Sequence, residues 1–302
     1  MITTLFSVRR IIVKKMNFDY SKLLFWLPSS IYLKILFKKK MNKKLDLKNP
    51  VTYNEKLQWL KLHDHNPLYI KLVDKYEVKD IVAKIIGDKY IIPTYGVYDD
   101  FDDIDFSKLP KSFVIKCTHD SGSLVICKDK KNLNLKETRD TINSGLNGNY
   151  YYRSREWPYK NIKPRIIIEK YIENKTDDEL RDYNFFSFNG KVKMMLIASN
   201  EQSSGDTYFD FFDCDFKHLD IVNGHPCAPK KPHKPKNFQL MIELAEKLSK
   251  DIPHVRVDFY EMNGHVFFGK MTFYHWSGMM PYKPEKWDKI MGDLIDLNKI
   301  KK

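Results

Sequence analysis

The segment at residues 255–273 constrains the fold more than any other part of this sequence. It reads Val-Arg-Val-Asp-Phe at 255–259, continues to an Asn-Gly pair at 263–264, and returns as Phe-Gly-Lys-Met-Thr-Phe at 268–273. Arg256 and Asp258 are two residues apart between apolar neighbours, so both side chains lie on one face of a strand. Asn-Gly between two such runs is a strong hairpin signal. The segment therefore predicts two antiparallel strands that present an arginine and an aspartate together.

The length of the connection decides which residue lies opposite Asp258. With a three-residue connection, Asp258 faces Lys270 and Arg256 faces Thr272. With a two-residue connection Lys270 turns to the other face, because a shift of one residue moves every side chain across the sheet. A pair of carboxylates at this place would hold Mg²⁺ against nucleotide phosphates. The lysine at 270 changes that chemistry in the first arrangement.

Basic residues are concentrated at the N-terminus. The chain of 302 residues has a formal net charge of +13, and residues 1–48 hold twelve Lys/Arg against two Asp, so most of the excess lies there. A nucleic-acid-binding domain would spread basic residues over a folded face, so we expect no nucleic-acid partner. A hydrophobic content of 42% with 14% aromatics indicates a folded globular body.

Residues 1–45 combine apolar and aromatic runs with the lysine cluster at 38–40. One interpretation is an interfacial amphipathic helix that recruits the protein to an anionic membrane surface and is dispensable for folding. The other is a helix that packs on the domain while its lysines remain in solvent. Met1 and Met16 are both candidate start residues.

The four cysteines, Cys117, Cys127, Cys214 and Cys227, are scattered, with no Cys-x-x-Cys pair and no partnered histidine spacing. We therefore expect neither a disulfide framework nor a zinc site, and we expect reduced thiols. No apolar run approaches the roughly 18 residues of a membrane span, and no secretory cleavage site is evident. These features indicate a cytoplasmic protein, peripheral at the inner face of the membrane if residues 1–45 bind lipid.

Hairpins and helices alternate along the chain, which indicates an α+β architecture with mostly antiparallel sheets. The expected elements are two helices over 51–86, a strand at 91–97, hairpins at 113–127 and 183–198, a strand at 165–172, and a helix at 237–250. The predicted divisions are a basic amphipathic segment at 1–48, a helical region at 49–110, one subdomain at 111–172 and a second at 173–302.

Two segments have a pattern suited to phosphate and base recognition. Lys116 lies in an apolar strand just before the polar loop Thr118–Ser123, so it can place a charge on a phosphate that the loop N–H groups cover. A lysine on the wet face of a half-buried strand explains the same pattern. Glu169-Lys170-Tyr171-Ile172 ends a strand and can offer backbone groups to an adenine edge, as can any edge strand.

Taken in order, these segments resemble the ATP-grasp superfamily, and specifically the teichuronopeptide-biosynthesis (TupA-like) family, from about Leu47 to Leu297. The resemblance rests on Asn-Pro-Val-Thr-Tyr-Asn-Glu-Lys-Leu-Gln-Trp-Leu at 49–60 and on the segments 72–76, 113–122, 153–164, 169–171, 182–183, 255–258 and 269–278. It implies two α+β subdomains with a nucleotide cleft between antiparallel sheets.

The resemblance also implies roles for individual residues. Lys116 and Arg256 would be catalytic, with Lys116 on the ATP phosphates and Arg256 on the transferring phosphoryl group. Asp258 would bind Mg²⁺. The remaining nucleotide-binding residues would be those of the phosphate loop, the adenine hinge and the strands beside them: His119, Ser121, Gly122, Ser123, Glu169, Lys170, Tyr171, Ile172, Asp182 and Lys270.

The activity implied is an ATP-dependent ligase that activates a carboxylate as an acyl phosphate for attack by an amine. Its substrates would be uronic acids or amino acids in cell-surface polysaccharide assembly, such as capsule, O-antigen or teichuronopeptide. Against the family pattern, Lys270 replaces a metal-binding Glu, Asp120 enters the phosphate loop, Asn184 replaces a basic residue, and His-Trp at 275–276 replaces Pro-Gly.

Two other functions are consistent with the sequence. The first is a nucleotide-binding relative with impaired catalysis, because two of these changes remove or reverse charges on which phosphoryl transfer relies. The second is a glycosyltransferase, for which Asp213-Cys214-Asp215 would be the metal and nucleotide-sugar motif.

Overall fold

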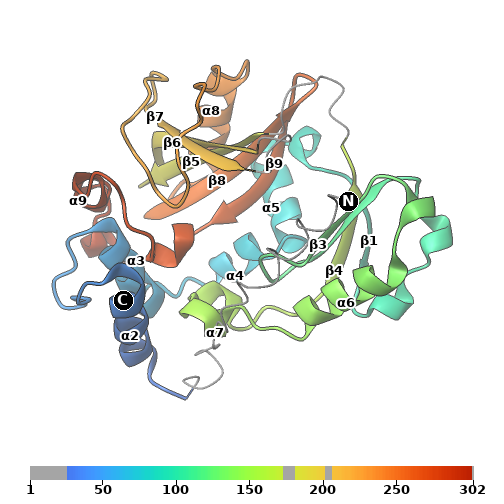
Figure 1. Cartoon of the computed structure of the whole chain (residues 1–302), viewed down its shortest axis with the longest axis horizontal. Coiled ribbons are helices and arrows are strands. Elements are labelled where there is room, and N and C mark those ends of the chain that lie inside the picture. Colours follow the sequence, from blue (N-terminus) through green and yellow to red (C-terminus); the bar gives the residue numbers. More distant parts are fainter. Residues whose placement is uncertain (1–25, 173–180, 201–205, 301–302) are drawn as a thin grey trace, which may run out of the picture.

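Two antiparallel sheets and a group of helices make up the molecule, shown in Figure 1. The computed structural model describes residues 26–172, 181–200 and 206–300. The expected α+β architecture with antiparallel sheets is confirmed. Residues 1–25 of the basic N-terminal segment lie outside the described residues.

The first sheet has the order β1-β4-β2-β3, from β1 (Thr94–Tyr98), β4 (Ile166–Lys170), β2 (Phe113–Cys117) and β3 (Leu124–Cys127). Alternate residues of β2 are buried, as expected for a strand with one covered face. Helix α6 (Leu135–Leu146) contacts β2 and β3, and Ile142 joins the core of this sheet. Because β4 lies between β1 and β2, its side chains sit at the centre of the sheet.

The second sheet has the order β7-β6-β5-β8-β9. Its strands are β5 (Arg181–Phe188), β6 (Lys191–Asn200), β7 (Thr207–Phe212), β8 (His254–Met262) and β9 (His265–Thr272). Helix α8 (Phe238–Leu248) buries its apolar side against β5, β6 and β8. This packing belongs to the largest core of the described chain, which also includes side chains of the N-terminal helices.

Residues 51–86 form three helices, where the sequence predicted two. They are α3 (Tyr53–His63), α4 (Leu68–Val73) and α5 (Glu77–Ile86). The additional break is at Asp74, whose Oδ1 accepts hydrogen bonds from the backbone N–H of Tyr76 (2.8 Å) and Glu77 (2.9 Å). An aspartate that bonds the backbone two and three residues ahead ends one helix and caps the next.

Helix α2 (Ser29–Met41) packs on the body with one side. Tyr32, Leu33, Phe37 and Met41 are buried in a small core with Met279. Tyr32 also donates a hydrogen bond to the Arg153 carbonyl (3.0 Å). Within the described part of the chain, none of the helices is long and apolar enough to cross a membrane.

Candidate functional site

A bulge at Gly269 sets the register of the β8–β9 hairpin. The connection has two residues, since Met262 pairs with His265, and Asn263 and Gly264 both have positive φ (53° and 77°), as a type I′ turn requires. One extra residue, Gly269, then shifts the ladder, so that Asp258 pairs with Lys270 and Arg256 with Thr272. A Cβ on Gly269 would lie only 3.0 Å from the Asp258 carbonyl oxygen. The short turn and the bulge together place Lys270 opposite Asp258.

Arg256 is held in a chain of hydrogen bonds on this face. Its Nε and Nη2 donate to the two carboxylate oxygens of Asp258, each at 2.7 Å. Its Nη1 donates to His275 Nδ1 (2.5 Å), and His275 Nε2 lies 3.0 Å from Asn223 Oδ1. Because Nδ1 accepts, Nε2 carries the proton and donates to Asn223. The guanidinium is therefore fixed in orientation from both sides.

The two buried histidines beside Arg256 are neutral. Burial, with the Arg256 charge as a second cause, holds the pKa of His275 well below its usual value. Burial likewise lowers the pKa of His254 to about 3. His254 accepts from the Tyr53 hydroxyl at Nε2 (2.9 Å) and donates from Nδ1 to the Ser187 carbonyl (2.9 Å).

The groups around Asp258 do not fit a Mg²⁺ site. Both of its oxygens accept hydrogen bonds from Arg256, and the Lys270 ammonium lies 3.6 Å from Oδ2. Mg²⁺ takes oxygen ligands and is repelled by cations this close. Glu261 is three residues from Asp258 on β8 and so points to the opposite face of the strand, where its Oε1 accepts from the Asn237 side chain (2.6 Å) at the start of α8.

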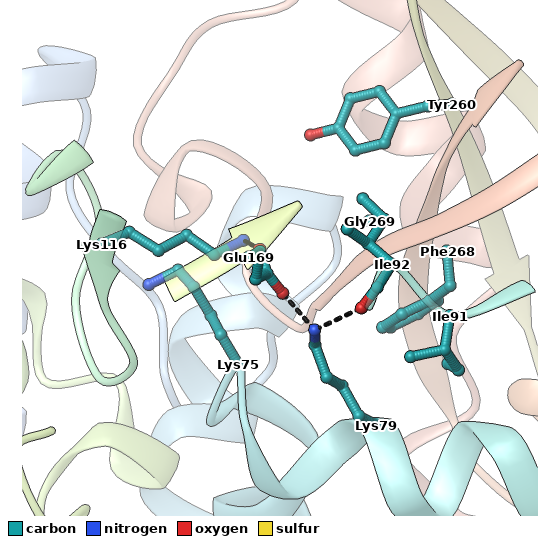
Figure 2. A pocket seen from close by; sticks show the side chains of 9 residues that line it. All are labelled: Lys75, Lys79, Ile91, Ile92, Lys116, Glu169, Tyr260, Phe268 and Gly269. Carbon is teal, nitrogen blue, oxygen red and sulfur yellow. Dashed lines mark hydrogen bonds and ion pairs between the residues drawn. The ribbon is translucent and has the colours of Figure 1, made fainter. Parts of the chain in front are cut away.

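A cleft with a cluster of lysines lies between the first sheet and the β8–β9 hairpin, as shown in Figure 2. Glu169 is buried at its centre and forms ion pairs with Lys116 and Lys79. Lys79 also donates to the Ile92 carbonyl (2.7 Å). The wall opposite the lysines is mostly apolar or aromatic and consists of Ile91, Ile92, Tyr260, Phe268 and Gly269.

Lys75 completes the lysine cluster and supports the phosphate loop predicted from the sequence. Its ammonium donates to the carbonyls of Cys117 (2.7 Å) and Asp120 (2.6 Å). Burial lowers the pKa of Lys75 to about 8, although Asp120 raises it. Burial alone would raise the pKa of Glu169, but Lys116 and Lys79 outweigh it and the pKa is lowered. Three lysines face two carboxylates here, because Glu169 pairs with Lys116 and Lys79, and Asp120 Oδ1 lies 3.7 Å from the Lys75 ammonium. The cluster therefore keeps a net positive charge, which favours an anionic ligand.

The loop Thr118–Ser123 lies at the edge of this cleft. His119 Nε2 hydrogen-bonds the Gly145 carbonyl of α6 (3.1 Å), while its Nδ1 and Thr118 Oγ1 are buried without a hydrogen-bond partner in the described chain. Ser121 and Gly122 form the exposed tip. Ser123 donates to the Asp120 carboxylate, which stabilises the turn from inside.

The other predicted nucleotide-binding residues are placed along β4 and β5. The backbone N–H of Lys170 donates to the Pro93 carbonyl (2.9 Å), and Tyr171 and Ile172 follow β4 as half-buried residues. Asp182, on β5, is half-buried near the Arg256 face, and burial raises its pKa despite the Lys270 charge.

Sequence reasoning did not identify four residues of this arrangement. Lys79 lies on α5, but Lys75 lies in the turn before that helix, so no helical spacing connects the two lysines in the sequence. His275 was noted only as a departure from the family pattern, and Asn223 lies in an irregular loop with no periodic signal.

Asp213-Cys214-Asp215 does not join the cleft. Asp213 Oδ1 accepts from the backbone N–H of Asp215 (3.0 Å) and Lys217 (2.8 Å). Its role is to stabilise a local turn after β7.

Comparison with solved structures gave distant matches. They include D-alanine–D-alanine ligase from Helicobacter pylori, with 16% identity over 74% of this chain and 61% of that one, and a TM-score of 0.43. The same ligase from Bacillus anthracis, complexed with ATP, has 15% identity over 67% and 55% of the two chains, and a TM-score of 0.39. This chain therefore spans less than two thirds of the length of either ligase. A sequence comparison with curated proteins gave no match.

A comparison with protein-family models gave a match over most of the chain. The model for TupA-like ATP-grasp proteins covers residues 55–296, which include both sheets and all the residues of the cleft. The chain therefore belongs to the TupA-like ATP-grasp family.

Proposed function

We propose that this protein is an ATP-dependent ligase that joins a carboxylate to an amine, with the nucleotide phosphates bound by the lysines around Glu169. The observation that carries the proposal is the convergence of Lys75, Lys79 and Lys116 in a cleft whose other wall is apolar. The cleft as it stands has a volume of about 20 Å³, which is room for a water molecule, so a nucleotide would have to part its walls. Its lining combines cations for a polyanionic tail with apolar side chains for a flat base. Family membership supports ATP as the ligand.

In the proposed reaction, a carboxylate oxygen attacks the γ-phosphorus and ADP leaves. The amine then attacks the acyl carbon, phosphate leaves, and the nitrogen loses a proton. The lysines would neutralise the phosphates, and Lys116 is the best placed, because Glu169 is its one ion-pair partner among the described residues. The Arg256 guanidinium, fixed by Asp258 and His275, would stabilise charge on the transferring group.

A second candidate is a nucleotide-binding protein with slow turnover. It is favoured by the contacts of Arg256 and Lys270 with Asp258, because they leave that carboxylate without a free oxygen for a metal ion. The two candidates share the nucleotide site and differ in catalysis alone. ADP release in the presence of uronic acids and amino acids separates them.

The binding experiment compares ATP, ADP and nucleotide sugars by calorimetry, with and without Mg²⁺. ATP and ADP should bind, and Lys116→Met should weaken binding by about tenfold or more, since a hydrogen bond to a charged group contributes about 1.5–3 kcal/mol. Lys247→Met, an exposed lysine on α8 outside the cleft, is the matched control. Binding of nucleotide sugars without ATP or ADP would contradict the proposal and favour a glycosyltransferase.

The pathway and the location are further parts of the proposal. A role in cell-surface polysaccharide assembly, with uronic-acid or amino-acid substrates in the cytoplasm, rests on the family resemblance. Contact with an anionic membrane is supported by the outer face of α2, where Ile31 and Ile35 are 47% and 46% exposed beside Lys34 and Lys38. Flotation with anionic vesicles should be reduced by Lys34→Glu combined with Lys38→Glu; unchanged flotation would remove the membrane from the proposal.

A further inference from the structure

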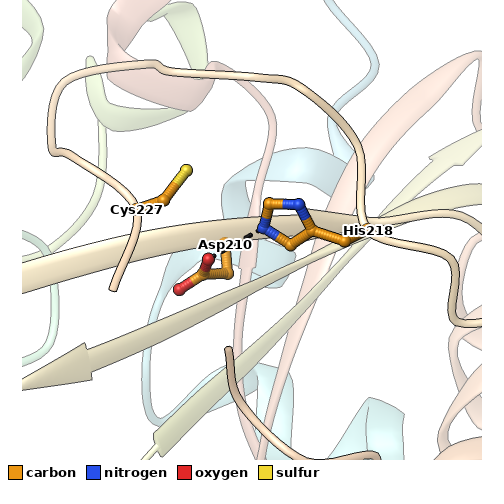
Figure 3. A group of neighbouring side chains, drawn as sticks. All are labelled: Asp210, His218 and Cys227. Atoms are coloured by element: carbon orange, nitrogen blue, oxygen red, sulfur yellow. Dashed lines mark hydrogen bonds and ion pairs between the residues drawn. The ribbon is translucent and has the colours of Figure 1, made fainter. Parts of the chain in front are cut away.

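Three side chains with metal-binding atoms meet beside β7, away from the lysine cleft. Asp210 is on β7, His218 follows the turn after that strand, and Cys227 lies in the loop beyond. One ligand atom from each residue lies within 4.8 Å of the other two. Figure 3 shows the carboxylate and the sulfur on the side of the imidazole ring that carries Nε2.

We propose that Asp210, His218 and Cys227 form a binding site for a divalent transition-metal ion of the Zn²⁺ type. The donor set is one carboxylate oxygen, one imidazole nitrogen and one thiolate sulfur. This mixture suits Zn²⁺, which takes such ligands in tetrahedral sites, whereas Mg²⁺ and Ca²⁺ take oxygen ligands. The proposal is independent of the function proposed for the cleft.

The burial of Asp210 supports a bound cation. Its side chain is fully buried, and a buried carboxylate is costly unless a positive charge or several hydrogen bonds compensate it. Its described contacts are His218 Nε2 at 2.9 Å on Oδ1 and the Ala228 N–H at 3.1 Å on Oδ2. No Lys or Arg of the described chain forms an ion pair with it. A metal ion would supply the missing charge.

The positions of the side chains argue against a nucleophilic triad. In a Cys-His-Asp triad the carboxylate and the sulfur contact different nitrogens of the imidazole. Here the carboxylate contacts Nε2, and Cys227 lies on that same side of the ring. The three groups are thus arranged around one point, as ligands of one ion are.

The backbone already brings the three residues together. Leu219 N–H donates to the Phe211 carbonyl (2.8 Å), and Phe209 N–H donates to the Pro226 carbonyl (2.9 Å). The two ends of the segment from His218 to Cys227 therefore lie against the outer edge of β7, the outermost strand of its sheet, while its middle pairs with Lys283. A metal ion would tie this segment to β7 at both of its ends.

The segment also carries Asn223, the partner of His275 at the Arg256 site. Asn223 lies between His218 and Cys227 in the sequence, and its Nδ2 donates to the carbonyls of Met280 and Pro281, both at 3.2 Å. We infer that the metal ion has a structural role. It would fix the loop from which Asn223 orients His275, and through it Arg256.

The test uses the full-length protein after treatment with a chelator. Co²⁺ should bind at one equivalent and give the near-ultraviolet charge-transfer band of a cobalt–thiolate bond, and Zn²⁺ should displace it. Cys227→Ser should abolish the band, and His218→Asn should weaken Zn²⁺ binding at least tenfold. Cys214→Ser, which removes an exposed cysteine in the turn between β7 and His218, should leave both unchanged.

A second measurement needs no variant. Zn²⁺ should slow alkylation of Cys227, read by mass spectrometry, while Cys214 in the same sample reacts at an unchanged rate. The proposal is overturned if the unmodified protein binds no stoichiometric Co²⁺ or Zn²⁺. It is also overturned if Zn²⁺ protects both cysteines equally, or if the cobalt band persists in Cys227→Ser.

Discussion

Replacement of Lys270 should change how nucleotide binding depends on Mg²⁺. In the unmodified protein the Lys270 ammonium lies 3.6 Å from Asp258 Oδ2, and Arg256 occupies both oxygens of that carboxylate. We therefore expect nucleotide binding that is nearly independent of Mg²⁺, with slow or absent turnover. Lys270→Met removes one cation, and Lys270→Glu also adds a carboxylate opposite Asp258.

The expected gain in Mg²⁺ affinity follows from the distance between Lys270 and Asp258 and from the solvent exposure of Lys270. A Mg²⁺ ion on Asp258 Oδ2 would lie on the order of 4 Å from the ammonium, where two unit charges interact by about 1 kcal/mol in water and about 4 kcal/mol at an effective dielectric of 20. The metal carries two charges, which doubles both values. Lys270 is 50% exposed, so solvent screening favours the lower limit. A gain of about 2 kcal/mol corresponds to roughly thirtyfold tighter Mg²⁺ binding in Lys270→Met.

The assay is calorimetric titration of a non-hydrolysable ATP analogue at several Mg²⁺ concentrations. Lys270→Glu should show a stronger Mg²⁺ dependence than Lys270→Met, and both should exceed the unmodified protein. Lys247→Glu makes the same change of charge on α8 and should have no effect. Strong Mg²⁺ dependence or rapid Mg²⁺-dependent turnover in the unmodified protein would refute the reasoning, because another group would then hold the metal.

Three further predictions concern stability and the phosphate loop. Burial lowers the pKa of Lys61 from 10.5 to about 8. Between about pH 8 and 10.5 the unfolded state therefore binds more protons than the folded state. In that range the contribution of Lys61 to the free energy of unfolding rises with pH. Lys61→Met should remove that rise from urea denaturation curves, and a difference curve that is flat across this range would contradict it. Gly264→Ala should lower the free energy of unfolding by about 1 kcal/mol in the same assay, because the position has a φ of 77°. As its control, Asn263→Gly should change the free energy of unfolding by less than about 0.5 kcal/mol. Equal effects of the two substitutions would contradict the turn assignment. Lys75→Met should speed amide hydrogen exchange in residues 118–123, because the Lys75 ammonium donates to the carbonyls of Cys117 and Asp120. Unchanged exchange would show that Lys75 does not stabilise the loop and would leave ligand binding as its role.

The elements that the sequence predicted well are those with a local chemical signal. Apolar runs on both sides of the Asn-Gly pairs predicted the β5–β6 and β8–β9 hairpins, because these turns need residues that tolerate positive φ. The break between α4 and α5 was missed, since it depends on the Asp74 side chain rather than on apolar spacing. The register at Lys270 was left open, because the bulge at Gly269 adds one residue that periodicity does not reveal.

The sequence named Lys116, Glu169, Arg256 and Asp258 as candidates, and the structure brings Lys116 to Glu169 and Arg256 to Asp258. The remaining contacts join distant parts of the chain. Lys79 meets Glu169 ninety residues later, and no spacing rule connects them. The same is true of Asp210, His218 and Cys227, because a search for closely spaced Cys and His pairs does not detect three side chains that a strand edge and a loop bring together.

The neutral histidines beside Arg256 have a consequence for enzymology. Burial keeps the pKa of His254 and of His275 below its ordinary value, so neither histidine takes up a proton near or above neutral pH, and a guanidinium stays charged throughout. For the proposed ligase, an inflection of kcat in that range would then come from a group other than these two histidines, of which the attacking amine is one. Lys75, with a pKa of about 8, lies instead at the phosphate end of the cleft, and its deprotonation would act on the KM for the nucleotide. Separate pH profiles of kcat and KM thus offer a way to recognise the unknown amine substrate by its own pKa.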